Sequence, residues 1–437
     1  IWFCLVGSEM CIRDRVIEMG DQYFRFHTQG QTLKYSNGAA WNNATAYTVG
    51  DIALQGGVNY YCTVAHTNQA PPNASYWYAL PADYTYEVPS PYLEAELFDV
   101  HYVQSADVLT LVHPNCPPKE LRRLGATKWE LKTIDFGSPL PAPTGVTVTT
   151  YIPSSTSTNA DTFEDHEYVV TAVKANLVDE SNQSAVGLTG AGATPTNNIF
   201  VTGAKNTISW TAVTGASRYR VYKNQGGIYG FLGETTTTTI VDNNIAPDFT
   251  KTPPIHENDF VGTGNYPGAV SYFEQRRVFA GTNNAPQDIW MTKSGTESNM
   301  SFGLPIKDDD RIEFRVAARE ANTIRHIVPL TNLLMLTGSA EWRITSVNSD
   351  AITPTSISVK PQSYVGSNNA QPVIVNNSLV YGAARGGHVR ELGYNWQANG
   401  FITGDLSLRA PHLFDNFTIT DMAFSKAPIP IVWMGKY

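Results

Sequence analysis

The chain has 437 residues, of which 16% are charged, and its formal net charge is −9 at pH 7. This length exceeds the roughly 250 to 300 residues that one hydrophobic core supports, so we expect several domains. An acidic balance without any run of lysine or arginine excludes a protein that wraps nucleic acid by neutralising phosphates. Plentiful Gly, Pro, Thr, Asn and Tyr favour strands and turns, so the sequence predicts an all-β fold.

Both ends of the sequence are unusual. Residues 1–15, IWFCLVGSEMCIRDR, contain an apolar run too short to span a bilayer and no basic region before it. The stretch resembles the translated read-through of a sequencing adapter, so we leave it out of the fold prediction. The chain stops at IVWMGKY, inside an apolar, strand-like run, and we therefore expect truncation at both ends.

The first part of a β core is expected over residues 16–39 and 81–138. Its opening VIEMGDQYFRFHTQGQTL predicts a hairpin with a Gly-Asp turn, because Phe24 and Phe26 alternate with polar neighbours. Residues 40–80 interrupt this core as a compact aromatic module. Farther along, Ser90–Phe98 is the best helix candidate, with Ser90 as N-cap and Pro91 at the first helical position.

A β-sandwich is expected over residues 139–254. A proline-containing linker opens this Thr/Ser-rich segment, and HEYVVTAVKA, NTISWTAV and SRYRVYKN are typical of sandwich strands. Trp210 and Tyr219 lie in two of these strands, and we interpret Trp210 as a core residue.

Residues 255–437 should form the second part of the β core, because they contain a weak repeat of strand, turn and shorter strand. Equivalent positions are Val278, Leu334, Val380 and Val432, spaced by about 50 residues, near the roughly 40 to 50 of propeller blades. A fifth unit, SADVLTLVHPNCPPKELRR, precedes the sandwich. The sequence thus predicts a propeller-like or irregular repeated β-sheet core, with an inserted small aromatic β module and an inserted β-sandwich.

Several segments of the core, in one order, resemble a family of phage and prophage tail proteins related to the tail nozzle or tail tubular protein B. They include YEVPSPYLEAELFDVHYVQSADVLTLVHPNC, YFEQRRVFAGTNNAPQDIWMTKSG, NTIRHIVPLTNLLMLTGSAEWRI and GGHVRELGYNWQANGF. The resemblance implies a virion component assembled in the host cytoplasm. It further implies a homo-oligomeric ring that joins portal, adaptor and other tail proteins, retains the genome and later lets DNA pass.

The module at 40–80 is similar to small chitin-binding-type carbohydrate modules. The resemblance makes five aromatic residues candidates for contact with a cell-surface glycan: Trp41, Tyr47, Tyr60, Tyr61 and Trp77. Such modules carry exposed aromatics just after the tyrosine strand, where this chain has Ala65 and His66, so a purely structural role for the module stays open. The insert at 139–254 resembles a fibronectin type III sandwich.

Four arginines in strands flanking turns are candidates for ion pairs between subunits, namely Arg276, Arg277, Arg385 and Arg390. Ordinary surface exposure is the alternative interpretation. A receptor- or glycan-binding tail adhesin and a secreted carbohydrate-active protein are the alternative functions.

No catalytic motif stands out, because HExxH, GxSxG and P-loop patterns are missing from the sequence. His113 and Cys116 in HPNC provide two possible ligands, whereas structural zinc takes four. Adjacent Asp308, Asp309 and Asp310 cannot all point at one ion, so we expect a solvated turn there. We therefore predict no enzyme activity, no catalytic residue, no metal and no cofactor.

Overall fold

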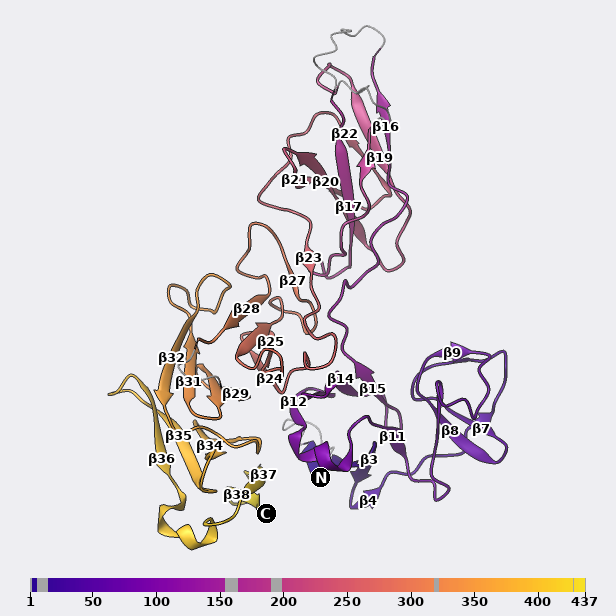
Figure 1. Cartoon of the computed structure of the whole chain (residues 1–437). Helices are drawn as coiled ribbons and strands as arrows, with labels where there is room; N and C mark the ends of the chain where they lie inside the picture. Colours follow the sequence, from indigo (N-terminus) through magenta and orange to yellow (C-terminus); the bar gives the residue numbers. More distant parts are fainter. Residues whose placement is uncertain are drawn as a thin grey trace.

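The computed structural model describes residues 2–5, 15–153, 164–189, 199–317, 322–426 and 428–436. Strands are the main regular structure of these residues, and the helical segments among them are short 3-10 turns: η1 (Glu94–Asp99), η3 (Ser407–Arg409) and η4 (Pro411–Leu413). The all-β prediction is confirmed (Figure 1). Of the residues set aside at the start, Trp2–Leu5 form a strand and Arg15 begins another, while the others lie outside the described residues.

The expected helix at Ser90–Phe98 begins later than predicted and is a 3-10 helix. The Ser90 hydroxyl accepts the backbone N–H of Tyr92 at 3.2 Å, which uses this side chain in a local turn instead of an N-cap. Leu93 is still extended, and η1 starts at Glu94. The Glu96 carboxylate accepts the backbone N–H of Leu93 at 3.2 Å, so the helix start is satisfied from inside the helix.

The N-terminal sheet runs in the order β1-β2-β3-β11, with β4 beside β3. Its hairpin turns at Asp21–Gln22, one residue later than predicted, and Gly20 pairs with Tyr23. Phe24 and Phe26 are fully buried, as the alternation predicts. The strands are β1 (Trp2–Leu5), β2 (Arg15–Gly20), β3 (Tyr23–Thr28), β4 (Gln31–Thr32) and β11 (Glu87–Pro89).

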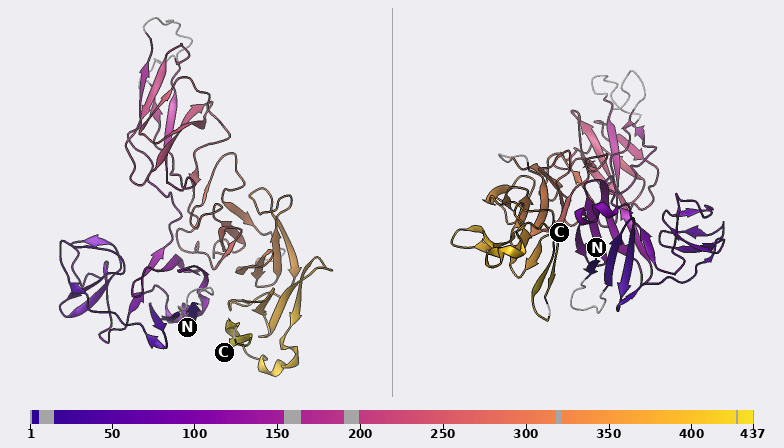
Figure 2. Two further views of the ribbon diagram at one scale, coloured as in Figure 1. Left: turned by 180° about the vertical axis from the view of Figure 1, so that it is seen from behind. Right: turned by 60° about the horizontal axis from the view of Figure 1, so that its bottom comes forward.

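The aromatic module forms a small sheet in the order β10-β8-β7-β5, with a separate β6–β9 pair. It lies to one side of the core in every view of the molecule (Figures 1 and 2). Its strands are β5 (Ala39–Ala40), β6 (Ala46–Tyr47), β7 (Ile52–Gln55), β8 (Val58–Cys62), β9 (His66–Thr67) and β10 (Trp77–Ala79).

The core repeats one pattern in the described residues, an antiparallel sheet of four strands in the order first-second-third-fourth. Unit 1 consists of β12 (His101–Ser105), β13 (Val108–His113), β14 (Cys116–Arg123) and β15 (Trp129–Thr133). Unit 2 consists of β24 (Ala269–Phe273), β25 (Arg276–Ala280), β26 (Asp288–Met291) and β28 (Ile312–Arg315).

Units 3 and 4 follow directly along the chain. Unit 3 consists of β29 (Ile324–Pro329), β30 (Leu333–Thr337), β31 (Glu341–Thr345) and β32 (Ser358–Ser363). Unit 4 consists of β33 (Val373–Val375), β34 (Ser378–Gly382), β35 (Val389–Asn395) and β36 (Gly400–Asp405). A last hairpin pairs β37 (Ile419–Ser425) with β38 (Ile431–Lys436).

The predicted equivalent positions fall at matching places in these sheets. Val278, Leu334 and Val380 lie on the second strands of units 2, 3 and 4, and Val432 lies on the second strand of the last hairpin. The core is therefore a series of blade-like sheets, as predicted. In each sheet of units 2 to 4, the apolar second strand lies between two hydrogen-bonded neighbouring strands.

The sandwich is inserted between units 1 and 2 and extends away from the core (Figure 1). Its two sheets, β16-β19-β22 and β18-β17-β20-β21, enclose a core that contains Trp210 and Tyr219, so Trp210 is a core residue as predicted. The strands are β16 (Thr147–Tyr151), β17 (Glu167–Val173), β18 (Gly187–Leu188), β19 (Lys205–Ser209), β20 (Arg218–Gln225), β21 (Ile228–Thr235) and β22 (Thr239–Asp242). A short pair, β23 (Ile255–His256) with β27 (Ser301–Phe302), lies between sandwich and core.

The blocks on either side of the sandwich pack together as one scaffold. Val112 of unit 1 shares a buried cluster with Val270, Phe279 and Trp290 of unit 2. Units 2 and 3 share a second cluster, and units 3 and 4 share a third. Each sheet thus buries one face against the next, which a single four-stranded sheet cannot do alone.

Candidate functional site

The first strands of units 1 to 4 converge on one cavity of about 210 Å³, here called the axial cavity. Its wall is formed by β12, β24, β29 and the stretch Gln371–Ile374 that leads into β33. Gln371 ties the first and last of these segments together, because its amide nitrogen donates to the Tyr102 carbonyl at 2.9 Å and its side-chain oxygen accepts the Tyr102 N–H at 3.2 Å.

Two buried histidines lie at the edge of the axial cavity. The Nδ1 atom of His101 lies 2.6 Å from the Gly268 carbonyl oxygen, and its Nε2 atom lies 2.9 Å from that of Asn369. The His326 Nε2 atom lies 2.9 Å from the Asn368 carbonyl oxygen, and the two imidazole rings are 4.7 Å apart. The hydrogen bonds of these two rings connect units 1, 2, 3 and 4, so the rings have a structural role here. The sequence contained no sign of it, because the partners are backbone atoms far along the chain.

The pKa of His326 is held well below its usual value, first by burial and then by the neighbouring His101 and Arg325 charges. The unfolded chain therefore binds this proton before the folded one as the pH falls. The contribution of neutral His326 to the free energy of unfolding should be fully present above about pH 6.5. At lower pH, the free energy of unfolding should decrease by about 1.4 kcal/mol per pH unit from His326 alone. Hydrogen-exchange protection of the β29 amides, compared at neutral and mildly acidic pH after correction for the intrinsic exchange rates, should depend less on pH in His326→Gln. An unchanged dependence would contradict this assignment.

Arg276 and Arg277, expected at a subunit interface, are instead buried inside unit 2. Arg277 is fully buried, and its guanidinium donates to the Glu120 carboxylate of unit 1 at 2.7 Å and to Glu297 at 3.0 Å. Burial alone would raise the pKa of Glu120, but the Arg277 charge holds it below its usual value. This pair is an internal tie between units 1 and 2, so the intersubunit expectation is wrong for both arginines.

Arg276 organises the aspartate-rich turn that was expected to be solvated. Its guanidinium donates to the carbonyl oxygens of Asp308 at 2.7 Å and Asp310 at 2.6 Å. Asp310 itself is buried and accepts the N–H groups of Gly303 and Lys307. The turn is thus held in place by hydrogen bonds to buried side chains of unit 2 and is only partly solvated. Desolvation in this environment lowers the pKa of Arg276.

Arg385 and Arg390 remain accessible, unlike the other two candidates. Arg385 is exposed, and Arg390 is half-buried, with its guanidinium 3.4 Å from the Thr403 hydroxyl. Both belong to unit 4: Arg390 lies on β35, and Arg385 lies in the turn before it.

The aromatic module buries most of the residues expected to meet a sugar. Tyr47, Tyr61 and Trp77 are at most 8% exposed, so their ring faces form no surface platform. Tyr47 and Trp77 lie in the module's own core, and Tyr61 packs into the cluster of the N-terminal sheet and unit 1. Trp41 and Tyr60 are half-buried. The physical reason is the size of the module, because so small a sheet needs its large aromatics inside.

His66 stands at a position where similar carbohydrate modules carry an exposed aromatic residue. Its ring packs edge-on against Trp77 and Tyr76 at 4.9 and 5.1 Å, and it also contacts Tyr47. The side chain therefore closes the aromatic core, and burial lowers its pKa.

Comparisons with known proteins give little further guidance. No family model and no curated protein matches the chain. Two similar solved structures are YCF48 from Cyanidioschyzon merolae, 10% identical with a TM-score of 0.30 over 99% of this chain and 96% of that one, and a protein from Lactobacillus plantarum, 9% identical with a TM-score of 0.27 over 90% and 95%. Within the described residues, no helix has the length and apolar character needed to cross a membrane.

Proposed function

We propose that this chain is a structural subunit of a bacteriophage tail, part of a nozzle-like ring that retains and later conducts DNA. The supporting observation is that the two sequence blocks resembling tail proteins pack as one scaffold, while both inserts lie outside it. The resemblance covers the segments that form units 1 to 4, and it does not extend to the module or the sandwich.

The contacts between units suit a mechanical role. The Glu120–Arg277 ion pair joins units 1 and 2, and His101 links them to the segment before unit 4. Buried, hydrogen-bonded ties of this kind fix the relative positions of packed sheets, because separating them leaves charges and polar groups without partners. A net charge of −9 also suits a duct for DNA, since weakly repelling walls keep phosphate contacts few.

Unit 4 carries the surface that we assign to contact between subunits. Trp396, in the turn between β35 and β36, is 79% exposed, and Tyr394 beside it is 47% exposed. Large aromatics on an outer turn are typical of residues that a second copy of the chain covers. Arg385 and Arg390 of the same unit can provide the charged contacts around it.

The proposal predicts that the purified chain forms rings that light scattering and electron microscopy detect. Trp396→Ala should weaken self-association by about 30-fold, as expected for an aromatic residue central to an interface. Tyr151→Ala is the matched control, because Tyr151 is 56% exposed on the sandwich and should leave association unchanged. A chain that stays monomeric at high concentration would refute the ring, and equal effects of the two substitutions would refute the assigned surface.

A further inference from the structure

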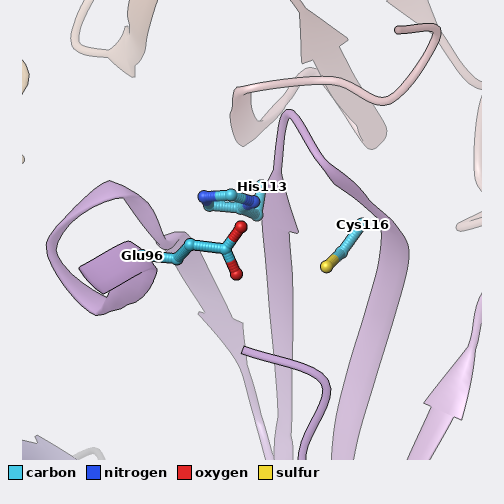
Figure 3. Close-up of side chains that lie close together, drawn as sticks. All are labelled: Glu96, His113 and Cys116. Atoms are coloured by element: carbon cyan, nitrogen blue, oxygen red, sulfur yellow. The ribbon is translucent and has the colours of Figure 1, made fainter. Parts of the chain in front are cut away.

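Three metal-binding side chains meet where η1 packs against the β13–β14 turn. His113 ends β13 and Cys116 begins β14, and the two residues are directly paired across Pro114–Asn115. Glu96 reaches them from η1. One ligand atom from each of the three lies within 4.8 Å of the others. Figure 3 shows the Glu96 carboxylate below the imidazole of His113, with the sulfur atom of Cys116 to the right of both.

A fourth residue independently indicates a ligand at this place. Tyr92 is fully buried, and its hydroxyl has no hydrogen-bond partner within the described part of the chain. Its ring meets that of His113 at 6.0 Å. Burial raises the pKa of this hydroxyl, and the charges of Cys116 and Glu96 raise it further. A buried hydroxyl without a partner is costly, so its position calls for an additional group.

The surrounding hydrogen bonds hold the ligands in place. The Asn115 side chain donates to one oxygen of Glu96 at 3.1 Å, and the backbone N–H of Leu93 donates to the other at 3.2 Å. Each carboxylate oxygen keeps a second lone pair for a metal. The Asn115 N–H also donates to the His113 Nδ1 atom at 3.2 Å, a contact that coordination through Nε2 would keep and coordination through Nδ1 would give up.

We propose that Glu96, His113 and Cys116 bind a divalent transition-metal ion of the zinc class. Thiolate, imidazole and carboxylate together match Zn²⁺, whereas Mg²⁺ and Ca²⁺ prefer oxygen ligands alone. Coordination removes the proton of the Cys116 thiol, which passes to solvent, and no redox step is involved. The Tyr92 hydroxyl donates to a metal ligand or to a water in the fourth position. The ion joins η1 to unit 1, and this role is independent of the proposed tail function.

The test uses the full chain, freed of metal by a chelator and titrated with Co²⁺ or Zn²⁺ alone. Cobalt should bind one to one and give the absorption band of a cobalt–thiolate bond, and zinc should displace it. Cys116→Ser should abolish the band, and Cys62→Ser, at a buried cysteine elsewhere, should retain it. His113→Gln should weaken zinc binding by at least about 100-fold and Tyr92→Phe by about 10-fold.

The melting temperature distinguishes a variant that has lost metal binding from one that has misfolded. Zinc should raise the melting temperature of the metal-free protein and of Cys62→Ser, and it should leave that of Cys116→Ser unchanged. The absence of a thiolate band in the folded wild type, or an equal band in Cys116→Ser, would overturn the proposal. Binding that survives both His113→Gln and Glu96→Gln would overturn it as well.

Discussion

Replacing Arg277 by alanine is expected to lower the free energy that holds units 1 and 2 together by about 3–5 kcal/mol. The substitution leaves Glu120, which is 3% exposed, as a buried carboxylate. Arg122 remains beside it, but its guanidinium is already used at the other carboxylate oxygen, through a 2.6 Å hydrogen bond. Arg277 also donates to the Tyr272 hydroxyl at 3.0 Å, and this partner is lost too.

Hydrogen exchange is the suitable measurement, because unfolding of a chain with several domains need not be a two-state transition. Protection of the β14 and β25 amides should fall in Arg277→Ala, while the sandwich amides should keep their protection. Arg315→Ala is the matched control within unit 2. Arg315 pairs with Asp288 at 2.6 Å but its side chain is 67% exposed, so its loss should cost at most about 1 kcal/mol. Equal losses in the two variants would contradict the buried-tie interpretation.

The regular parts of this fold follow from local patterns. Alternation over Val16–Leu33 identified both strands of the first hairpin, because one face of that sheet is buried and the other is not. The apolar runs around Val278, Leu334 and Val380 identified the second strands of units 2 to 4, which are flanked on both sides within their sheets. Such signals are local in sequence, so they need no knowledge of tertiary contacts.

The charged and aromatic residues were harder to place, because their roles depend on partners far along the chain. Arg276 and Arg277 read as surface residues, since arginine is rarely buried, and their neutralising contacts come from distant loops and from unit 1. From sequence, Tyr47 and Trp77 are suited both to a sugar platform and to a core, and the packing of the module decides between these uses.

The cluster around Glu96 shows the same limit. His113 and Cys116 stand close together in HPNC and could be noticed from spacing alone, but two ligands predict no site. The third ligand lies on a 3-10 helix whose start was predicted three residues too early. The Tyr92 hydroxyl, which has no hydrogen-bond partner among the described residues, is visible only once the burial is known. A metal site assembled from separate elements therefore needs the fold before it can be recognised.

Replacing Trp129 by alanine should destabilise the N-terminal region by about 3–5 kcal/mol, the cost typical of emptying a large buried aromatic site. The Trp129 ring stacks on Phe26 of the N-terminal sheet with centroids 4.2 Å apart. Its backbone carbonyl accepts the Tyr61 hydroxyl of the module at 2.7 Å, and its N–H donates to Tyr86 at 3.0 Å. Unit 1, the first sheet and the module thus meet at this one residue of β15.

The resulting loss should appear as weaker hydrogen-exchange protection in β3, β8 and β15 together, with units 3 and 4 unaffected. Trp433→Ala is the control, since Trp433 is 62% exposed and its removal should change little. Trp129→Phe separates two contributions, because it keeps a ring against Phe26 while it removes a buried indole N–H that has no hydrogen-bond partner among the described residues. It should therefore cost clearly less than alanine. If only β15 lost protection in Trp129→Ala, the module would be attached to the core by other contacts, and Trp129 would be an ordinary core residue of unit 1.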